Sequence, residues 1–140
     1  MERREFLKTG CTFCLLGVVG MMLPVSVDAK GKRKVFKAEV VDNKIAVPLT
    51  EFAEHNIVIL RVKKWDYDIA VEKNEDSTYN AILLKCTHMD NSLNVSGGGY
   101  MCSMHGSEFD KQGVVLKGPA EIPLTKYAVT INEDSITINT

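Results

Sequence analysis

The sequence predicts an all-β protein in which antiparallel strands form a sandwich or barrel. From Val35 onward, short segments alternate apolar and polar residues with a period of two, as half-buried strands do. Asn, Asp, Gly and Pro interrupt these segments at short, regular intervals, which is typical of all-β folds. An N-terminal signal or anchor helix is predicted to precede the strands.

The predicted strands are short and are separated by polar turns. Asp42-Asn43 has turn chemistry between the first two strands, and Pro48 ends the second. Residues 49–54 predict a short helical turn, and Asn132-Glu133-Asp134 reverses the chain before the last strand. The predicted strands cover residues 35–40, 44–47, 56–64, 67–73, 79–84, 113–117, 127–131 and 135–138.

Length and charge restrict the function. The 140 residues suffice for one domain with a core and an N-terminal extension. The 17 basic and 18 acidic residues nearly cancel, so no nucleic acid or strongly charged partner is indicated. No Ser/His/Asp set, phosphate-binding loop or catalytic carboxylate pair is visible. We expect one domain over residues 35–140, preceded by a basic linker at 30–34.

Residues 1–29 have the parts of an export signal. A basic start is followed by an uncharged, mostly apolar run and by a small-residue site that ends at Ala29. The start, Arg3-Arg4-x-Phe6-Leu7-Lys8, resembles the bacterial twin-arginine signal, whose cargo is exported already folded. The apolar run is also just long enough to span a membrane. The leader is therefore either cleaved after Ala29 or retained as an anchor, and both alternatives place the domain in the periplasm, at the outer face of the cytoplasmic membrane.

The residues that carry chemistry are concentrated between Cys86 and Asp110. Cys86-x-His88 is followed, after thirteen residues, by Cys102-x-x-His105. Two thiolates and two imidazoles suit either a tetrahedral zinc ion or a two-iron cluster. The spacing of these four residues alone leaves both alternatives open.

The residues that follow the second histidine extend the pattern. They are Gly106-Ser107-Glu108-Phe109-Asp110 and, further on, Gly118-Pro119-Ala120. The complete pattern resembles that of the Rieske iron–sulfur proteins, closely over about residues 80–131 and loosely in the flanking strands. The resemblance implies a Rieske domain with one 2Fe–2S cluster, held in a small subdomain at about residues 85–120.

The resemblance also implies a role for each site residue. Cys86 and Cys102 would bind a buried iron, and His88 and His105 an iron near the surface. Ser107 would donate a hydrogen bond to a cluster sulfide, and Phe109 stands where high-potential members have a tyrosine. The remaining positions implied to surround the cluster are Gly106, Gly118 and Pro119, and the Gly97-Gly98-Gly99 run is expected to let the backbone approach the sulfurs.

One departure from the respiratory members of the family concerns a disulfide. Those proteins have a second cysteine in each ligand loop, and the two cysteines join the loops. This chain has Asn91 and Met104 at the matching positions. It therefore resembles the disulfide-free members, which include ferredoxins and oxygenase components as well as some exported subunits.

The expected function is one-electron transfer by an exported subunit rather than by a complete enzyme. It would carry electrons from a quinol or from a partner oxidoreductase subunit to a c-type cytochrome, as in quinol–cytochrome c reductases. The partner would be a quinol-oxidising cytochrome b-type subunit or another oxidoreductase subunit. One alternative is the small subunit of a periplasmic molybdenum oxidase that resembles arsenite oxidase. A second is a zinc-stapled binding module without redox chemistry. The leader argues against a soluble ferredoxin.

Overall fold

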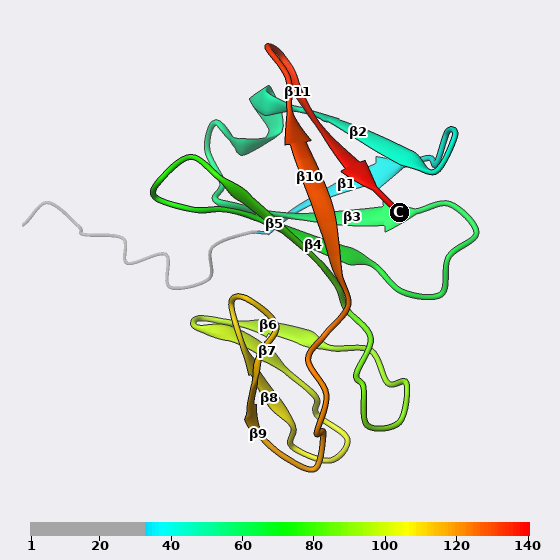
Figure 1. Ribbon diagram of the computed structural model, residues 1–140, viewed down its shortest axis with the longest axis vertical. Coiled ribbons are helices and arrows are strands. Elements are labelled where there is room, and N and C mark those ends of the chain that lie inside the picture. The colour runs from blue at the N-terminus through cyan, green and yellow to red at the C-terminus, as the bar shows by residue number, and fades with distance from the viewer. Residues whose placement is uncertain (1–32) are drawn as a thin grey trace, which may run out of the picture. The chain divides into compact units, whose positions relative to one another are not determined.

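The computed structural model describes residues 33–140 (Figure 1). The predicted leader, at 1–29, and residues 30–32 of the predicted linker lie outside this range. No helix within residues 33–140 has the length and apolar character needed to cross a membrane.

Seven strands form one sheet in the order β1-β3-β4-β5-β10-β11-β2. The edge strands β1 and β2 also contact each other, so the sheet curls into a nearly closed barrel (Figure 1). A 3₁₀ helix, η1 (Leu49–Phe52), follows β2 and confirms the predicted helical turn. The strands of the barrel are β1 (Lys34–Ala38), β2 (Lys44–Pro48), β3 (Ile57–Val62), β4 (Ile69–Lys73), β5 (Tyr79–Leu83), β10 (Lys126–Ile131) and β11 (Ser135–Asn139).

A second, smaller sheet is inserted in the chain between β5 and β10. Its four strands are antiparallel neighbours in chain order. Because β5 and β10 pair with each other, the insertion leaves the barrel and returns to it at adjacent strands. The strands of the small sheet are β6 (Asn94–Ser96), β7 (Gly99–Met101), β8 (Glu108–Asp110) and β9 (Val115–Lys117).

The predicted all-β fold is confirmed, with two differences in detail. The sequence did not predict β6, β7 or β8, because strands of three residues are too short to show a period of two. In addition, β1 and β3 run parallel, whereas all other pairs of named strands are antiparallel. The chain passes through β2 and η1 between β1 and β3, which allows β3 to return in the same direction as β1.

The strands β3, β4 and β5 are buried on both faces. On the barrel side, Val58, Val71 and Ala81 belong to the interior core. On the opposite side, Ile59, Ala70 and Ile82 belong to a second core, which they share with the small sheet. This explains why the segments at 57–60 and 69–71 are uninterrupted apolar runs rather than alternating ones. From the small sheet and its loops, the second core receives Leu93, Val95, Tyr100, Phe109, Cys86 and Cys102.

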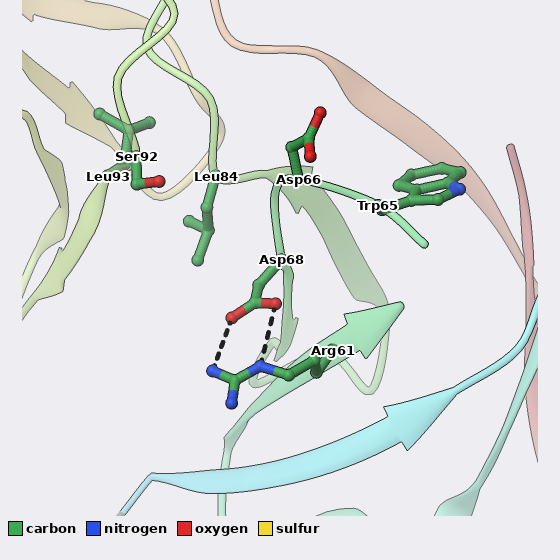
Figure 2. A pocket seen from close by; sticks show the side chains of 7 residues that line it. All are labelled: Arg61, Trp65, Asp66, Asp68, Leu84, Ser92 and Leu93. Atoms are coloured by element: carbon green, nitrogen blue, oxygen red, sulfur yellow. Dashed lines mark hydrogen bonds and ion pairs between the residues drawn. The ribbon is translucent and has the colours of Figure 1, made fainter. Parts of the chain in front are cut away.

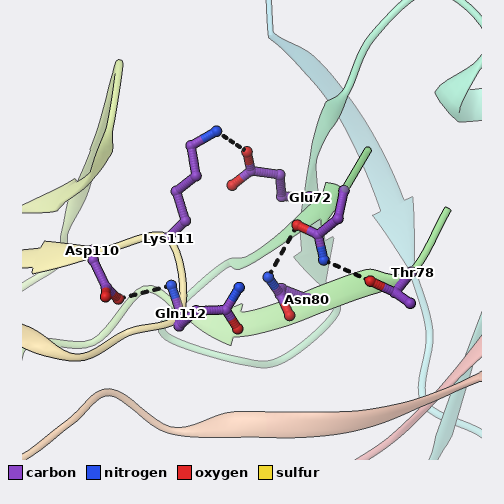
Figure 3. Close-up of polar contacts among 7 residues, drawn as sticks. Glu72, Thr78, Asn80, Asp110, Lys111 and Gln112 are labelled. Carbon is purple, nitrogen blue, oxygen red and sulfur yellow. Dashed lines mark hydrogen bonds and ion pairs between the residues drawn. The ribbon is translucent and has the colours of Figure 1, made fainter. Parts of the chain in front are cut away.

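A polar contact also fixes the small sheet to the barrel (Figure 3). Glu72 on β4 is only 6% exposed. Its carboxylate lies 2.8 Å from Nζ of Lys111, in the turn between β8 and β9. The bond to Glu72, together with its charge, raises the pKa of Lys111. Next to Lys111, the side chain of Gln112 accepts a hydrogen bond from Lys126 Nζ on β10 (2.7 Å).

We expect Lys111→Met to destabilise the protein by about 1–2 kcal/mol, because it leaves the buried Glu72 carboxylate without its charged partner. Urea unfolding of the purified protein would measure this change. The matched control is Lys117→Met, which removes an ion pair with Glu108 at 3.5 Å between two exposed side chains and should cost about 0–1 kcal/mol. Equal costs for the two variants would contradict the assigned role of Lys111.

Candidate metal centre

Each predicted ligand loop is a turn that begins at a cysteine and closes with the same two hydrogen bonds. In the first loop, the Cys86 N–H donates to the Asn91 carbonyl (2.7 Å) and the Asp90 N–H donates to the Cys86 carbonyl (3.0 Å). In the second, the Cys102 N–H donates to the Ser107 carbonyl (2.8 Å) and the Gly106 N–H donates to the Cys102 carbonyl (2.9 Å). The two loops therefore present their cysteines and histidines from equivalent turns.

Both turns need a left-handed residue at the fourth position after the cysteine. Gly106 has φ +81° and Asp90 has φ +55°. Glycine adopts this conformation without steric cost, and aspartate tolerates it better than most residues do. The identical requirement explains why a glycine follows His105 directly.

The four predicted ligands form two pairs. The side chains of Cys86 and Cys102 are fully buried and are not joined in a disulfide. His88 and His105 are exposed, and their rings meet edge to face with centroids 5.0 Å apart. A buried pair of sulfurs and an exposed pair of imidazoles would suit a cluster of two metal ions, with one pair of donors for each ion.

The environment of Cys102 favours a thiolate. Burial alone would raise its pKa, but the N–H groups of Met104 and His105 and the thiol of Cys86 donate to its sulfur, and the net effect lowers the pKa. N–H groups that point at one sulfur form a small anion-binding nest. The same groups would stabilise the negative charge of a metal-bound sulfur.

Ser107 is a buried polar residue of the second ligand loop. The side chain is fully buried, and its Oγ accepts a hydrogen bond from the Ala120 N–H (3.0 Å). A hydroxyl that accepts one bond keeps its own proton for a second partner. Ser107 therefore connects the second ligand loop to the Gly118-Pro119-Ala120 segment.

The first ligand loop is connected to the same segment. Thr87, between Cys86 and His88, donates its hydroxyl proton to the Ile122 carbonyl (2.7 Å). The peptide bond between Gly118 and Pro119 is cis, and both residues are exposed. The Gly118–Ile122 region is thus hydrogen-bonded to both ligand loops through the hydroxyls of Ser107 and Thr87. The sequence did not predict the bond of Thr87.

Phe109 lies in the second core with both cysteines. It is 1% exposed and stands opposite Tyr100 on the neighbouring strand. Burial, together with the nearby Glu72 and Asp110 charges, raises the pKa of Tyr100. At Phe109 the aromatic ring adds apolar surface around the sulfurs but no hydroxyl donor.

The expected role of the glycine run at 97–99 is corrected by the structure. Gly97 and Gly98 form the exposed turn between β6 and β7, at the closed end of a hairpin whose open end carries the two ligand loops (Figure 1). Gly99 is required for a different reason, since a Cβ there would lie 2.0 Å from the Phe109 carbonyl oxygen. These glycines shape the small sheet instead of approaching the sulfurs. His55 follows η1 on the barrel and is not part of the site.

A pocket of about 260 Å³ opens beside the first ligand loop (Figure 2). One wall comes from residues that flank the loop, Leu84, Ser92 and Leu93. The opposite wall comes from β3 and the β3–β4 connection, where Arg61 on β3 donates to both carboxylate oxygens of Asp68 in the connection (3.4 and 3.2 Å). The Arg61 guanidinium is thus already paired, and the pocket offers no unpaired buried charge to a ligand.

The barrel, the inserted small sheet and the paired ligands define a domain built to hold a metal cluster. Comparison with known proteins agrees with this class. The chain matches the Rieske [2Fe-2S] domain over residues 25–128. It therefore belongs to the Rieske family, whose members bind a 2Fe–2S cluster, and the donor set described above fits that cofactor.

Individual relatives support the same assignment. The chain is 34% identical over 95 residues to the cytochrome b6-f complex iron–sulfur subunit 2 of Synechocystis sp. (63% of this chain, 53% of that protein). It is 36% identical over 72 residues to the corresponding subunit of Synechococcus elongatus (49% and 38%). The chain thus spans about half the length, or less, of these two relatives.

A third relative, the subunit of Synechococcus elongatus strain PCC 7942, is 28% identical over 151 aligned positions (97% of this chain, 83% of that protein). Among solved structures, the plasma membrane Rieske protein PetC3 from Synechocystis PCC 6803 is similar, with a TM-score of 0.57 and 26% identity. That match covers 66% of this chain and 95% of PetC3.

We expect Gly106→Ala to destabilise the second ligand loop by about 1–2 kcal/mol, because a side chain disfavours φ near +81°. A Cβ at Gly106 would meet no atom within 4 Å, so the cost is conformational and not steric. Gly98→Ala is the matched control: its Cβ would also meet nothing, and its φ lies outside the left-handed range. Urea unfolding would compare the two variants, and an equal effect would show that the turn conformation is not the cause.

Proposed function

We propose that Cys86, His88, Cys102 and His105 hold a 2Fe–2S cluster through which the protein transfers single electrons. The observation that carries this proposal is the division of the donors into a buried pair of sulfurs and an exposed pair of imidazoles. When bound, the cluster supplies a one-electron couple, and two neutral imidazoles in place of two thiolates make reduction easier, toward roughly −150 to +300 mV.

The residues around the site would determine the reduction potential of this couple. The second core excludes water from the two sulfurs, and the N–H groups of Met104 and His105 donate to the Cys102 sulfur. The Ser107 Oγ accepts a bond from the Ala120 N–H, so its own proton would remain for a cluster sulfide. Hydrogen bonds to sulfur stabilise the more negative, reduced state and so raise the potential. Phe109 contributes no such bond. We therefore place the potential below the top of the Rieske range, which suits a low-potential quinol better than a high-potential one.

The surface around the histidines supports docking of a partner. Met89 follows His88, Met104 precedes His105, and Ile122 belongs to the segment bonded to Thr87. These three side chains are 61–65% exposed, although apolar residues of this size are usually buried. An apolar surface beside two exposed imidazoles suits an electron-transfer partner that must bring its own cofactor or substrate close to His88 and His105.

We infer a donor and an acceptor of the quinol–cytochrome class. The relatives named above are subunits of cytochrome b6-f complexes, which supports a cytochrome b-type quinol-oxidising partner and a c-type cytochrome acceptor over the molybdenum-oxidase alternative. The chain would then be an electron-carrying subunit of an oxidoreductase.

Location is part of the same proposal. Residues 1–29 would direct twin-arginine export, 30–34 would connect the leader to the domain, and 35–140 would work at the outer face of the cytoplasmic membrane. The sequence pattern of the leader supports this, and a similar solved structure is that of a plasma membrane Rieske protein. Cleavage after Ala29 and retention as an anchor predict different masses for the mature protein.

The purified protein should contain two irons and two acid-labile sulfides, be red-brown, and give a rhombic EPR signal of low average g when reduced. Alanine substitution of any of the four proposed ligands should abolish the cluster. His55→Ala should retain it, because His55 lies on the barrel away from the site. Stoichiometric zinc without iron in anaerobically purified protein would refute the proposal in favour of the zinc-stapled module.

Phe109→Tyr should raise the midpoint potential, provided the new hydroxyl donates to a cysteine sulfur. If that bond favours the reduced state by about 1 kcal/mol, the shift is roughly 40 mV, since tenfold in a one-electron equilibrium corresponds to about 59 mV. Ser107→Ala should lower the potential by a similar amount or more. Protein-film voltammetry would measure both shifts.

Phe52→Tyr provides the control for Phe109→Tyr. It makes the same chemical change in the barrel core and should leave the potential unaltered. Equal shifts in the two tyrosine variants, or none in Phe109→Tyr, would show that the Phe109 side chain does not face the sulfurs.

A further inference from the structure

The two ligand loops are supported very differently, although their internal hydrogen bonds match. The second loop connects β7 to β8, and three consecutive residue pairs join these strands up to Met101 and Glu108. The first loop follows β5 and is closed only by an isolated bridge between Lys85 and Ser92. The backbone that carries His88 therefore has less regular sheet beneath it than the backbone that carries His105.

A side chain from the barrel contacts the first ligand loop at the residue with left-handed backbone conformation. The hydroxyl of Tyr67 donates to the backbone carbonyl of Asp90. Asp90 is the left-handed residue of the turn, and its own N–H donates to the Cys86 carbonyl. The backbone N–H and the backbone carbonyl of Asp90 are thus both hydrogen-bonded, the first to Cys86 and the second to Tyr67.

Lys85 reinforces this contact. Its Nζ lies 3.3 Å from the Asp90 carboxylate and 5.5 Å from the centre of the Tyr67 ring. A cation over an aromatic face is attracted by the ring quadrupole. Lys85 therefore contacts the side chains of both Tyr67 and Asp90, which the bond from the Tyr67 hydroxyl to the Asp90 carbonyl already joins.

Tyr67 is itself held in place by the connection between β3 and β4. On one side, Asp68 is fixed by two hydrogen bonds from Arg61 (Figure 2), and its carbonyl accepts the Leu84 N–H (2.9 Å). On the other side, the Trp65 ring packs on Tyr127, with centroids 6.2 Å apart. Because its neighbours are anchored, the phenol can restrain the loop and not merely follow it.

From this geometry we infer that Tyr67 is a positioning residue, which holds the first ligand loop on the barrel and so sets the orientation of His88. Asn91 and Met104 stand where a disulfide could join the ligand loops, and the two cysteines of the described chain, Cys86 and Cys102, are not joined in a disulfide. The Tyr67 hydroxyl restrains the loop from the barrel side by a non-covalent bond. This inference rests on the proposed function insofar as His88 is a ligand.

The test compares Tyr67→Phe with Tyr79→Phe in the full-length protein. Tyr67→Phe keeps the ring beneath Lys85 and removes only the hydroxyl. Tyr79→Phe also removes one hydroxyl, from a ring that packs on Phe52 in the barrel core. Hydrogen–deuterium exchange followed by mass spectrometry would report on a peptide covering residues 85–92 and on a reference peptide covering 57–62 of β3.

Loss of one hydrogen bond should make exchange of the loop peptide about fivefold faster in Tyr67→Phe, with no change in the reference peptide. The reduced-state EPR lines of the same variant should broaden, because His88 would adopt several orientations on its iron. Tyr79→Phe should show neither change. A purely structural tyrosine would not alter the EPR line shape.

Three results would overturn the inference: unchanged exchange in the loop peptide, equal acceleration of both peptides, or an unchanged EPR line shape in Tyr67→Phe. Failure of Tyr67→Phe to fold would also overturn the inference, as equal acceleration of both peptides would, since it would show that Tyr67 stabilises the whole domain. Absence of iron from the unsubstituted protein would instead count against the proposed function, and the exchange comparison would still distinguish a local from a global role.

Discussion

Burial of both faces of β3, β4 and β5 is the constraint on which the site depends. One face completes the barrel core, and the other carries Ile59, Ala70 and Ile82 into a second core. Apolar side chains on an outer barrel face would be costly in water. The small sheet covers them, and in doing so it brings Cys86 and Cys102 into the same apolar core, away from water. The site is therefore a consequence of how the barrel is covered.

The contrast between the two donor pairs follows from this arrangement. The cysteines begin their turns at the edge of the second core, so their sulfurs point into apolar packing, whereas the histidines follow two or three residues later on the outside of each turn. A low dielectric strengthens every hydrogen bond to the sulfurs. In the proposed function, the exposed imidazoles would leave a route for an electron open to a partner. In this fold, the groups that would tune the potential of the cluster are buried, and the groups through which a partner would reach it are exposed.

Within residues 33–140, non-covalent contacts join the insertion to the barrel. Glu72–Lys111 fixes the β8–β9 turn, the Lys126–Gln112 bond ties the same turn to β10, and the Tyr67–Asp90 bond reaches the first ligand loop. Each bond contributes only about 0.5–3 kcal/mol. Their distribution around the insertion restrains it against the barrel. The proposed function would require this, because two imidazoles would have to be held in a defined geometry.

The all-β class, most of the barrel strands and the four-residue donor pattern could be predicted from the sequence alone, because alternation and ligand spacing are local properties of the chain. The sequence could not determine β6, β7 and β8, which are too short to show a period, or the parallel pairing of β1 with β3. The function of the 97–99 glycines and the contact of Tyr67 with Asp90, 23 residues away, also required the tertiary structure. Such contacts depend on how the chain returns on itself, and no local pattern encodes that.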